Sequence, residues 1–522
     1  MWRKMLSFTY HTRKLMLLSI FLALSFFICQ RLLRYRASRS ICREKGCQEP
    51  PSLPQWDPIF GLDIIVARLF GNSKSTSRNR FLQSLFTFHG HTFKTRLYGS
   101  TQLFTIAPSN IKAIYSSDFE SWGVGPVRGF VFGPLLGPGL MTEDGAVWKR
   151  SRTITAPTFA KPQFADLEAF DTHVSRLLTH IPMNGETVDL QPLFNRLALD
   201  STTEMLFGKS VASLTSNPPA DGQAFLDAFN YAQNGVGRRM VKPFWNVLTQ
   251  DKEFWKSCKL CHEFVDHIVA RAMTNFDSEK RSVSWTKKYI LVNELVRSTS
   301  DAIDIRRQLL NIFLPAHDAI AIPLTNIFFQ LARNPAVYSK LREEILALKG
   351  PSTTDPKALK KLPYLQKIIS ETSRLYPGVT TNERVALKDT FLPTGGGPLG
   401  TASIFVKKGD LVTLSFHALQ RRKDIWGADA EEWKPGRWDH EAAKQVALWT
   451  NLPFGGGPRV CPGQEQGLVQ LAFTIVRIVR EVRVLMNRDP VEDFEDSYRV
   501  VTVSQNGCRV ACMAALNMRT QS

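Results

Sequence analysis

The sequence predicts a mainly α-helical domain with a small β region, preceded by a single N-terminal transmembrane helix. Apolar residues recur at three- and four-residue spacing over most of the chain, and alternating strand patterns are short and confined to two places. The 522 residues are 43% hydrophobic and 22% charged, which is typical of a globular chain rather than a disordered or fibrous one. We find no internal repeat and no low-complexity linker after residue 60, so we expect one large domain.

The N-terminal segment has the features of a membrane anchor. Leu15 to Cys29 carries no charge, and a helix continued to Leu33, with Arg31 snorkelling, is about 28 Å long at about 1.5 Å per residue. A cleaved signal peptide is the alternative, but the small residues of a cleavage site are missing after the apolar run. We therefore expect a short N-terminal segment at 1–14 and an uncleaved transmembrane anchor at 15–33.

Positive charge is concentrated beside this apolar run. The formal net charge is +19, and residues 1–48 hold ten Lys and Arg residues against one acid. An excess of this kind indicates an anionic neighbour, and its position favours a membrane surface over nucleic acid. Basic residues are slightly more numerous after the run than before it, so the positive-inside rule favours a cytosolic domain.

A basic and proline-rich hinge is expected at 34–58. Pro50, Pro51, Pro54 and Pro58 interrupt any helix there and favour a stiff, extended segment. The folded domain is then expected at 59–522. Its cysteines are few and unevenly placed, so the sequence does not predict a disulfide framework, and a cytosolic domain would keep them reduced.

The elements of this domain follow from the hydrophobic spacing. The helical periodicity is clearest in five stretches, which are Phe164 to His180, Ala224 to Ala232, Ile305 to Ala332, Pro356 to Leu375 and Gln464 to Val484. The strand alternation falls near Thr92 to Ile106 and Val385 to Ser415.

The sharpest local signal is a glycine-rich stretch from Phe454 to Gly463 that contains Arg459 and Cys461. Glycines let the backbone curl tightly around the cysteine, and Pro462 suits a first helical position, so we expect Cys461 to be the N-cap of the next helix. A helix N-terminus favours a thiolate over a thiol. A rigid thiolate with a nearby arginine for an anion suits an axial haem ligand and a propionate contact.

The alternative is a glycine-rich turn with an incidental buried cysteine. The pattern Phe-x-x-Gly-x-Arg-x-Cys-x-Gly specifies five residues, and chance would produce it on the order of once in ten thousand chains of this length. The pattern therefore favours the haem interpretation. These residues resemble the haem-binding loop of the cytochrome P450 family.

Other stretches resemble this family in the same order. Glu371-Thr372-Ser373-Arg374 is similar to its Glu-x-x-Arg helix, and Pro435-Gly436-Arg437-Trp438 is similar to its Pro-Glu-Arg-Phe element, with a glycine in place of the acid. The resemblance implies that Glu371, Arg374 and Arg437 form a buried structural network.

Trp148-Lys149-Arg150-Ser151-Arg152 is similar to the family's Trp-x-x-x-Arg on a helix over the haem edge. Four-residue spacing places Trp148 and Arg152 on one helix face, where the resemblance implies that both reach haem propionates. The alternative is that the two side chains only pack on each other.

The resemblance runs over roughly residues 58 to 515 and is strongest to the fungal branch that hydroxylates alkanes and fatty acids. The resemblance to this branch rests on three stretches, which are Asp57 to Asp63, Asn382 to Ala386 and Leu392 to Gly397. It implies the cytochrome P450 fold and haem b, an iron protoporphyrin IX ligated by the thiolate of Cys461, with Arg459, Trp148, Arg152 and Phe454 as further haem contacts. It also implies O2, an NADPH-cytochrome P450 reductase as partner, and a single-pass place in the endoplasmic reticulum membrane with a cytosolic catalytic domain.

One departure lies in the long central helix. Where the family carries Ala-Gly-x-Asp/Glu-Thr-Thr, this chain has Pro315-Ala316-His317-Asp318-Ala319-Ile320. Asp318 keeps the acid, but Ala319 lacks the hydroxyl that in the family helps to deliver protons to bound oxygen. Either a water or substrate hydroxyl substitutes, or the chemistry needs no assisted O–O cleavage. Pro315 and Pro323 are expected to bend or unwind the helix.

The expected function is a monooxygenase acting on an apolar, bulky or long-chain substrate. The resemblance gives candidate pocket walls, which are Phe130, Phe132, Leu135, Leu136, Phe313, Leu314, Ala319, Val379 and Thr380, each with core packing as the alternative role. No phosphate-binding loop is present, so electrons come from another protein. Two rival functions are a P450-fold isomerase or dehydratase that uses no reductase, and a membrane-tethered binding protein with an inactive haem fold.

Two further motifs have simpler explanations. Cys258-Lys259-Leu260-Cys261-His262 matches the c-type haem attachment pattern, but it lies in a helical, cationic stretch without an evident second ligand. His317 adjoins the expected acid, but the matching family position points away from the haem, so we expect a core or surface histidine.

Overall fold

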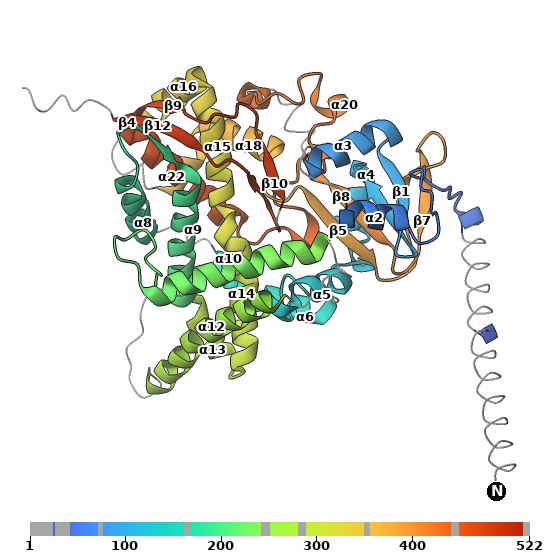
Figure 1. Ribbon diagram of the computed structural model, residues 1–522, viewed down its shortest axis with the longest axis horizontal. Coiled ribbons are helices and arrows are strands. Elements are labelled where there is room, and N and C mark those ends of the chain that lie inside the picture. Colours follow the sequence, from blue (N-terminus) through green and yellow to red (C-terminus); the bar gives the residue numbers. More distant parts are fainter. Residues whose placement is uncertain are drawn as a thin grey trace, which may run out of the picture.

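The computed structural model describes residues 25–26, 42–70, 77–160, 167–241, 251–279, 289–348, 355–439, 448–498 and 500–514. The predicted anchor at 15–33 lies outside these residues except at positions 25 and 26. Figure 1 shows a helical body on one side and most of the β structure on the other, around strands β1, β5, β7 and β8.

The described helices include those that build the body and those that flank the sheet. They are α2 (Leu62–Phe70), α3 (Arg78–His89), α4 (Pro108–Lys112), α5 (Gly125–Leu136), α6 (Gly145–Thr155), α8 (Glu168–Thr179), α9 (Leu190–Phe207), α10 (Ala220–Val241), α12 (Lys252–Glu279), α13 (Leu291–Ser298), α14 (Ala302–Ala319), α15 (Ala321–Arg333), α16 (Pro335–Leu346), α17 (Pro356–Lys360), α18 (Pro363–Leu375), α19 (Phe416–Leu419), α20 (Lys423–Trp426) and α22 (Gln464–Glu481).

The strands form four small sheets. They are β1 (Thr92–Leu97), β2 (Ser100–Thr105), β3 (Trp122–Gly123), β4 (Asn184–Asp189), β5 (Thr381–Ala386), β6 (Thr390–Gly396), β7 (Ala402–Val406), β8 (Leu411–Ser415), β9 (Val482–Asn487), β10 (Asp496–Tyr498), β11 (Thr502–Ser504) and β12 (Arg509–Ala514). The largest has the order β1-β2-β8-β5-β3, in which only β2 and β8 run parallel. A second sheet, β4-β12-β9, closes the opposite end of the molecule (Figure 1).

Three apolar clusters hold these layers together. One packs α8, α9, α15, α18 and α22 against β9 and β12, a second packs α5, α10, α12 and α14, and a third joins α3 to the five-stranded sheet. Helix α9 contributes Leu197 to the first cluster and Leu199 to the second, so it lies between them. Burial of aliphatic and aromatic side chains on several faces of these helices is what fixes their arrangement.

The central helix is interrupted, as its prolines predict. Helix α14 ends at Ala319 and α15 begins at Ala321, with Ile320 between them. Pro323 has no N–H for the carbonyl of Ala319, four residues earlier, and its ring crowds that carbonyl, so α14 ends at Ala319. Pro315 lies inside α14, which continues past it.

Together, α14 and α15 span Ala302–Arg333, and these 32 residues are long and apolar enough to cross a membrane. However, 72% of the most apolar window is buried inside the fold. The helix pair is therefore the core of the domain, and it does not test the predicted N-terminal anchor.

Most elements expected from the hydrophobic spacing are present, with three corrections. The stretch expected as one helix from Pro356 to Leu375 is two helices, because Pro363 begins the second. The C-terminal helix ends at Glu481, and the residues beyond it, expected as helix to Val484, form β9. The spacing also missed β4 and β12, which are short and stabilised by pairing with each other and with β9.

The C-terminal part of the predicted hinge lies along the sheet. The amide of Leu53 donates to the carbonyl of Lys94 at 2.9 Å, and the amide of Lys94 donates to Pro51 at 2.8 Å. The amide of Gln48 donates to Ser403 at 2.9 Å, on the β6–β7 hairpin. Residues 48–53 are thus attached to the folded domain.

Candidate active site

The glycine-rich loop holds Cys461 where its thiol is open. The amide of Cys461 donates to the carbonyl of Phe454 at 3.0 Å, which closes the loop, and Cys461 is exposed whereas Cys258 and Cys508 are buried. Gly457 has φ +63°, and a Cβ there would lie 1.7 Å from the carbonyl oxygen of Tyr115. Only glycine allows this approach, so the loop conformation depends on the residues that made it conspicuous in the sequence.

The expected helix cap is wrong by two residues. Gly463, not Cys461, is the N-cap of α22, because its carbonyl accepts the first helical hydrogen bond from Gly467 at 2.8 Å. The amide of Gly463 instead donates a hydrogen bond to the sulfur of Cys461. This hydrogen bond and the positive charge of Arg152 both lower the pKa of the Cys461 thiol. Desolvation is the larger effect and raises the pKa, so a thiolate here needs a cation at the sulfur.

Four arginines from distant parts of the sequence gather beside this loop. Burial lowers the pKa of Arg459 to about 10, against the raising effect of Asp144, and Arg384, Arg128 and Arg152 lower it further. Arg128 behaves similarly, since burial and then Arg384 lower its pKa to about 10. Mutual repulsion among buried guanidinium groups indicates that a negative charge belongs in this region.

This arginine cluster, Arg128, Arg152, Arg384 and Arg459, fits the two carboxylates of haem b. Among the charges that act most strongly on Arg128 and Arg459, the carboxylates are Asp144 and Glu383, and the other arginines of the cluster act against them. In addition, Nε of Arg459 is buried without a hydrogen-bond partner among the described residues. Two propionates would neutralise the excess charge and supply acceptors, so the residues present fit the group.

Arg459 also links the loop to the helix expected over the haem edge. Its Nη2 donates to Asp144 Oδ1 at 2.6 Å and to the carbonyl of Glu143 at 2.8 Å. Its guanidinium lies 4.5 Å from the ring centre of Trp148, which is buried on α6. Trp148 therefore packs against Arg459, whereas the charge of Arg152 acts on Cys461.

The network expected around Glu371 is present. Arg374 donates to both carboxylate oxygens of Glu371 at 2.8 and 2.9 Å, and both side chains are 0% exposed. Nε of Arg437 also donates to the carboxylate of Glu371 at 3.3 Å, and the indole N–H of Trp438 donates to it at 3.0 Å. The carbonyls of Gln420 and Ala430 accept from Arg374 at 2.7 and 2.8 Å, so this network ties α18 to the segments that precede the cysteine loop.

On the central helix, the structure separates Asp318 from Ala319. Asp318 accepts a hydrogen bond from Gln233 of α10 at 2.5 Å and contacts Nδ1 of His317 at 3.0 Å. Ala319 is exposed, as is Pro315 one turn earlier, although this helix is otherwise largely buried. The acid thus faces α10, and Ala319 faces open space with no hydroxyl.

His317 is a core histidine, as expected. It is buried, and its ring lies 5.7 Å from that of Phe229 and 6.1 Å from that of Phe313. Its Nε2 has no hydrogen-bond partner in the described part of the chain.

Burial divides the candidate pocket walls. Phe130, Ala319 and Val379 are exposed and remain candidates. The other six are buried in the fold, and these are Phe132, Leu135, Leu136, Phe313, Leu314 and Thr380. For these six, core packing accounts for their position.

The Cys-x-x-Cys-His motif is structural. Cys258 and Cys261 are buried on α12, and desolvation raises the pKa of Cys258 to about 12. His262 contacts the carbonyl of Leu135 through Nε2 at 2.9 Å. These side chains join α12 to α5 and offer no accessible thiol for attachment.

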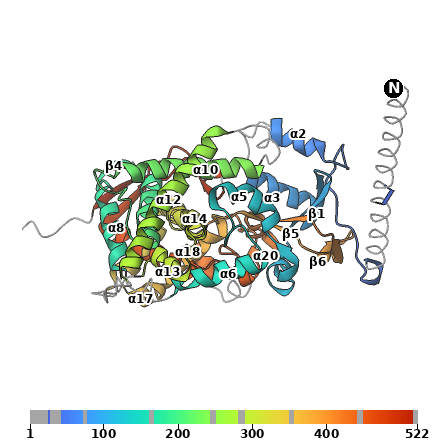
Figure 2. The same ribbon diagram turned by 90° about the horizontal axis from the view of Figure 1, so that it is seen from below.

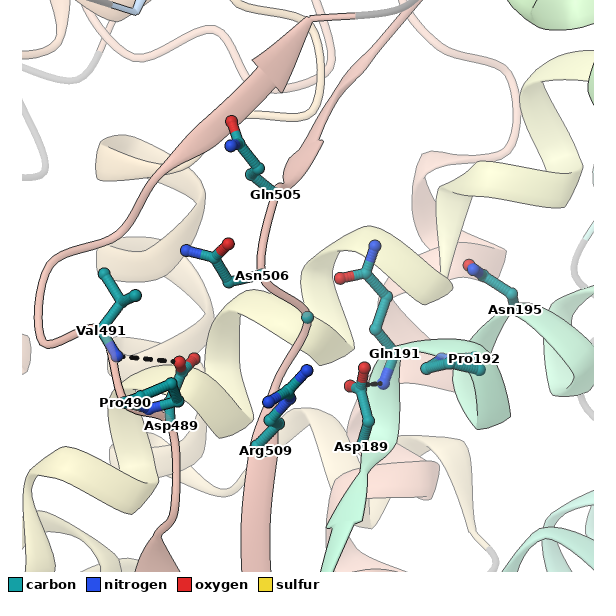
Figure 3. Close-up of a pocket in the computed structure, with 11 residues that line it drawn as sticks. Asp189, Gln191, Pro192, Asn195, Asp489, Pro490, Val491, Gln505, Asn506 and Arg509 are labelled. Atoms are coloured by element: carbon teal, nitrogen blue, oxygen red, sulfur yellow. Dashed lines mark hydrogen bonds between the residues drawn. The ribbon is translucent and has the colours of Figure 1, made fainter. Parts of the chain in front are cut away.

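A separate polar pocket of about 400 Å³ lies at the β4-β12-β9 end of the molecule (Figure 3). Asp189 and Gln191 face it from the start of α9, and Asp489, Asn506 and Arg509 face it from the C-terminal strands and their connections. None of the predicted site residues lines this pocket.

The sequence analysis did not identify Arg128, Arg384, Asp144 and Gln233. Isolated arginines and acids are common on surfaces, and nothing in the linear order marks these as neighbours of Cys461 or Asp318. Arg384 lies in a stretch that carried the branch resemblance, but only the folded chain shows its role in the charge cluster.

Comparisons with known proteins identify the family. The family model for cytochrome P450 matches residues 51–508. Cytochrome P450 monooxygenase himC of Aspergillus japonicus is 35% identical over 90% of this chain and 84% of its own length. Cytochrome P450 52A12 of Debaryomyces hansenii is 37% identical over 86% of this chain and 89% of its own length. Cytochrome P450 52E1 of Candida apicola is 36% identical over 74% of this chain and 76% of its own length.

The match covers most of the domain and includes the cysteine loop, the Glu371 network and the interrupted central helix. Members of this family are oxidoreductases with a thiolate-ligated haem. The chain belongs to the cytochrome P450 family.

Proposed function

We propose that this protein is a membrane-anchored haem-thiolate monooxygenase that oxidises an apolar substrate of long-chain or secondary-metabolite type. It would use O2 and electrons from an NADPH-cytochrome P450 reductase, at the endoplasmic reticulum membrane with the catalytic domain in the cytosol. The observation that carries the proposal is the exposed Cys461 beside the arginine cluster, in which Nε of Arg459 is buried without a hydrogen-bond partner among the described residues.

The residues divide the work as follows. Cys461 would ligate the haem iron through its thiolate, Arg152 and Arg459 would hold the propionates together with the rest of the arginine cluster, and the bound haem would supply oxygen activation. Trp148 and Phe454 would pack against the group. Asp318, held by Gln233, would take part in proton delivery, while Ala319 leaves room for a water or a substrate hydroxyl.

Replacing the axial ligand tests the proposal. We expect Cys461→Ser to abolish the long-wavelength Soret band of the reduced carbon monoxide complex, because serine does not provide a thiolate. Cys42→Ser is the matched control, since this partly exposed cysteine lies in the hinge and the band should remain. Survival of the band in Cys461→Ser would refute the assignment.

A second candidate function is a P450-fold isomerase or dehydratase, which Ala319 favours because such chemistry needs no assisted O–O cleavage. Product formation by the purified protein without reductase or NADPH would establish it. Strict dependence of product on both would support the monooxygenase.

A further inference from the structure

Two cysteines near the start of the folded domain lie at the two ends of one turn. Residues 42–44 are helical and 45–46 form a turn, in which Gly46 has φ +62°. The amide of Cys47 donates to the carbonyl of Cys42 at 2.8 Å, and the amide of Gly46 donates to that of Arg43 at 3.2 Å. These two hydrogen bonds around a left-handed glycine define the Schellman motif, which brings the side chains at its two ends into contact.

In this chain, both ends of the motif are cysteines. A disulfide needs Cα atoms about 4.4–6.8 Å apart, which a direct backbone hydrogen bond between the two residues permits. The two thiols already interact, since each is a hydrogen-bond partner of the other, and both are unbridged in the structure. The turn therefore prearranges Cys42 and Cys47 for a covalent bond.

The pair is also accessible to reagents in solution. Cys42 and Cys47 are partly exposed, whereas the described cysteines on α12 and around β12 are buried, and the exposed Cys461 is the proposed haem ligand. Desolvation is the largest effect on both thiols of the pair and raises the pKa of each. A thiol that is not stabilised as thiolate exchanges slowly, and the reduced form then gains no advantage over the bridge.

The turn lies where the chain enters the folded domain. Nζ of Lys45 lies 4.3 Å from the ring centre of Phe391 on β6, and the amide of Gly397 donates to the carbonyl of Glu49 at 3.0 Å. Figures 1 and 2 show this stretch, in dark blue, beside the β6–β7 hairpin. A bridge across the turn would fix the chain directly before it attaches to the hairpin.

We propose that Cys42 and Cys47 form a reversible dithiol–disulfide pair that fixes the turn joining the N-terminal segment to the β6–β7 hairpin. The oxidant is glutathione disulfide. The two S–H bonds and the S–S bond of glutathione break, the Sγ–Sγ bond forms, and both protons leave on two molecules of reduced glutathione. A reducing cytosol would keep the pair as thiols, so the bridge forms under oxidising conditions and is not a permanent structural link.

Disulfide mapping of the full-length, haem-loaded protein in lipid nanodiscs tests the pair. The protein is equilibrated with mixtures of reduced and oxidised glutathione, its free thiols are blocked, and its tryptic peptides are mapped by mass spectrometry without reduction. Arg43 and Lys45 are cleavage sites inside the ring, so a bridge leaves two peptides joined. We expect this bridge in the wild type and in Cys29→Ser, and a glutathione adduct on Cys42 in Cys47→Ser.

The contribution of the turn is tested at its glycine. Gly46→Ala places a side chain at positive φ where nothing lies within 4 Å, so only the backbone is strained, and we expect the equilibrium constant for closing the bridge to fall about two- to fivefold. Gly90→Ala is the matched control and should close the bridge like the wild type, since Gly90 has φ +81° and equally open surroundings. In the wild type, closing the bridge should slow hydrogen exchange at the amide of Cys47.

Three outcomes would overturn the proposal. The wild type would carry glutathione on each cysteine separately, or one of the two would join a different cysteine, or Gly46→Ala and Gly90→Ala would close the bridge equally well. Thermal melting of the reduced variants shows whether each is folded. Mapping of the wild type decides the pairing without any variant.

Discussion

At the scale of single residues, this site depends on which hydrogen-bond donors and acceptors are already paired within the protein. Arg459 was expected to bind a propionate, and the structure shows that part of its guanidinium is already committed to Asp144. Asp144 in turn accepts from the amides of Val124 and Gly125 at the start of α5. Arg459 thus connects the cysteine loop to a helix end, and its unpaired Nε leaves capacity for the haem.

Ala319 gives a prediction at this scale. The residue is exposed on the central helix, and Asp318 beside it is held away by Gln233. If a substrate hydroxyl takes the place of the family's alcohol, the added side chain of Ala319→Thr would clash with it and displace an ordered partner. We expect turnover of the true substrate to fall.

Product and peroxide formed per NADPH are the quantities to measure, on the substrate found by gene knockout and metabolite profiling. If water serves the relay instead, Ala319→Thr would keep turnover and raise the share of electrons that reach product. No change in either quantity would show that position 319 is not near the oxygen site.

The buried network around Glu371 gives a stability prediction. We expect Glu371→Gln to lower the free energy of unfolding by about 3–5 kcal/mol, because it leaves Arg374 buried with an uncompensated charge. Lys360→Gln is the control, since its pair with Glu465 is exposed and worth about 1 kcal/mol or less. Urea unfolding followed by tryptophan fluorescence measures both, and equal midpoints for the two variants would contradict the role given to the network.

At the scale of elements, the central helix is shaped by its prolines. The break at Ile320 leaves the carbonyl of Ala319 without a helical donor, next to the exposed surface of Ala319. A free carbonyl is an acceptor for water, so the break places a polar atom where the family has a hydroxyl. Pro315 does not interrupt α14, which shows that two prolines in one helix need not have the same effect.

Pro323→Ala tests this cause. The new N–H can donate to the carbonyl of Ala319, so we expect a continuous helix and slower hydrogen exchange at residues 319–322, which have an amide hydrogen in both proteins. Pro315→Ala is the matched variant and should leave exchange at Ile320 unchanged. Equal exchange in the wild type and Pro323→Ala would show that packing, rather than the proline, causes the break.

At the scale of the whole molecule, charge and apolar surface are concentrated at the N-terminal side. Ten of the chain's basic residues precede residue 49. Apolar side chains at the end of the predicted hinge and directly after it are also exposed, and they are Trp56 at 70%, Ile59 at 65% and Phe60 at 57%. Such a surface favours a membrane interface next to the predicted anchor.

Deleting residues 1–41 tests the anchor. This truncation keeps residues 48–53, which hydrogen-bond to the sheet, so the domain should still fold and bind haem. We expect the truncated protein to be released from membranes by alkaline carbonate, because surface contacts are reversible and a spanning helix is not. Unchanged resistance to carbonate would refute the anchor as the main attachment.

Features that depend on local chemistry could be predicted from the order of residues alone. Hydrophobic spacing predicted the long helices, and the glycines of the cysteine loop predicted its turn, because the positive φ of Gly457 is a local conformation that favours glycine. The order of three short motifs was enough to indicate the family. Such features depend on residues a few positions apart, so they can be found in the linear chain.

Which distant charges lie together is visible only in the folded chain. Arg128, Arg384 and Arg459 are separated by up to hundreds of positions, and their shared excess charge exists only after folding. The same holds for β9, where pairing with β12 overrides a helical periodicity. Burial and long-range pairing set these outcomes, and no local pattern encodes them.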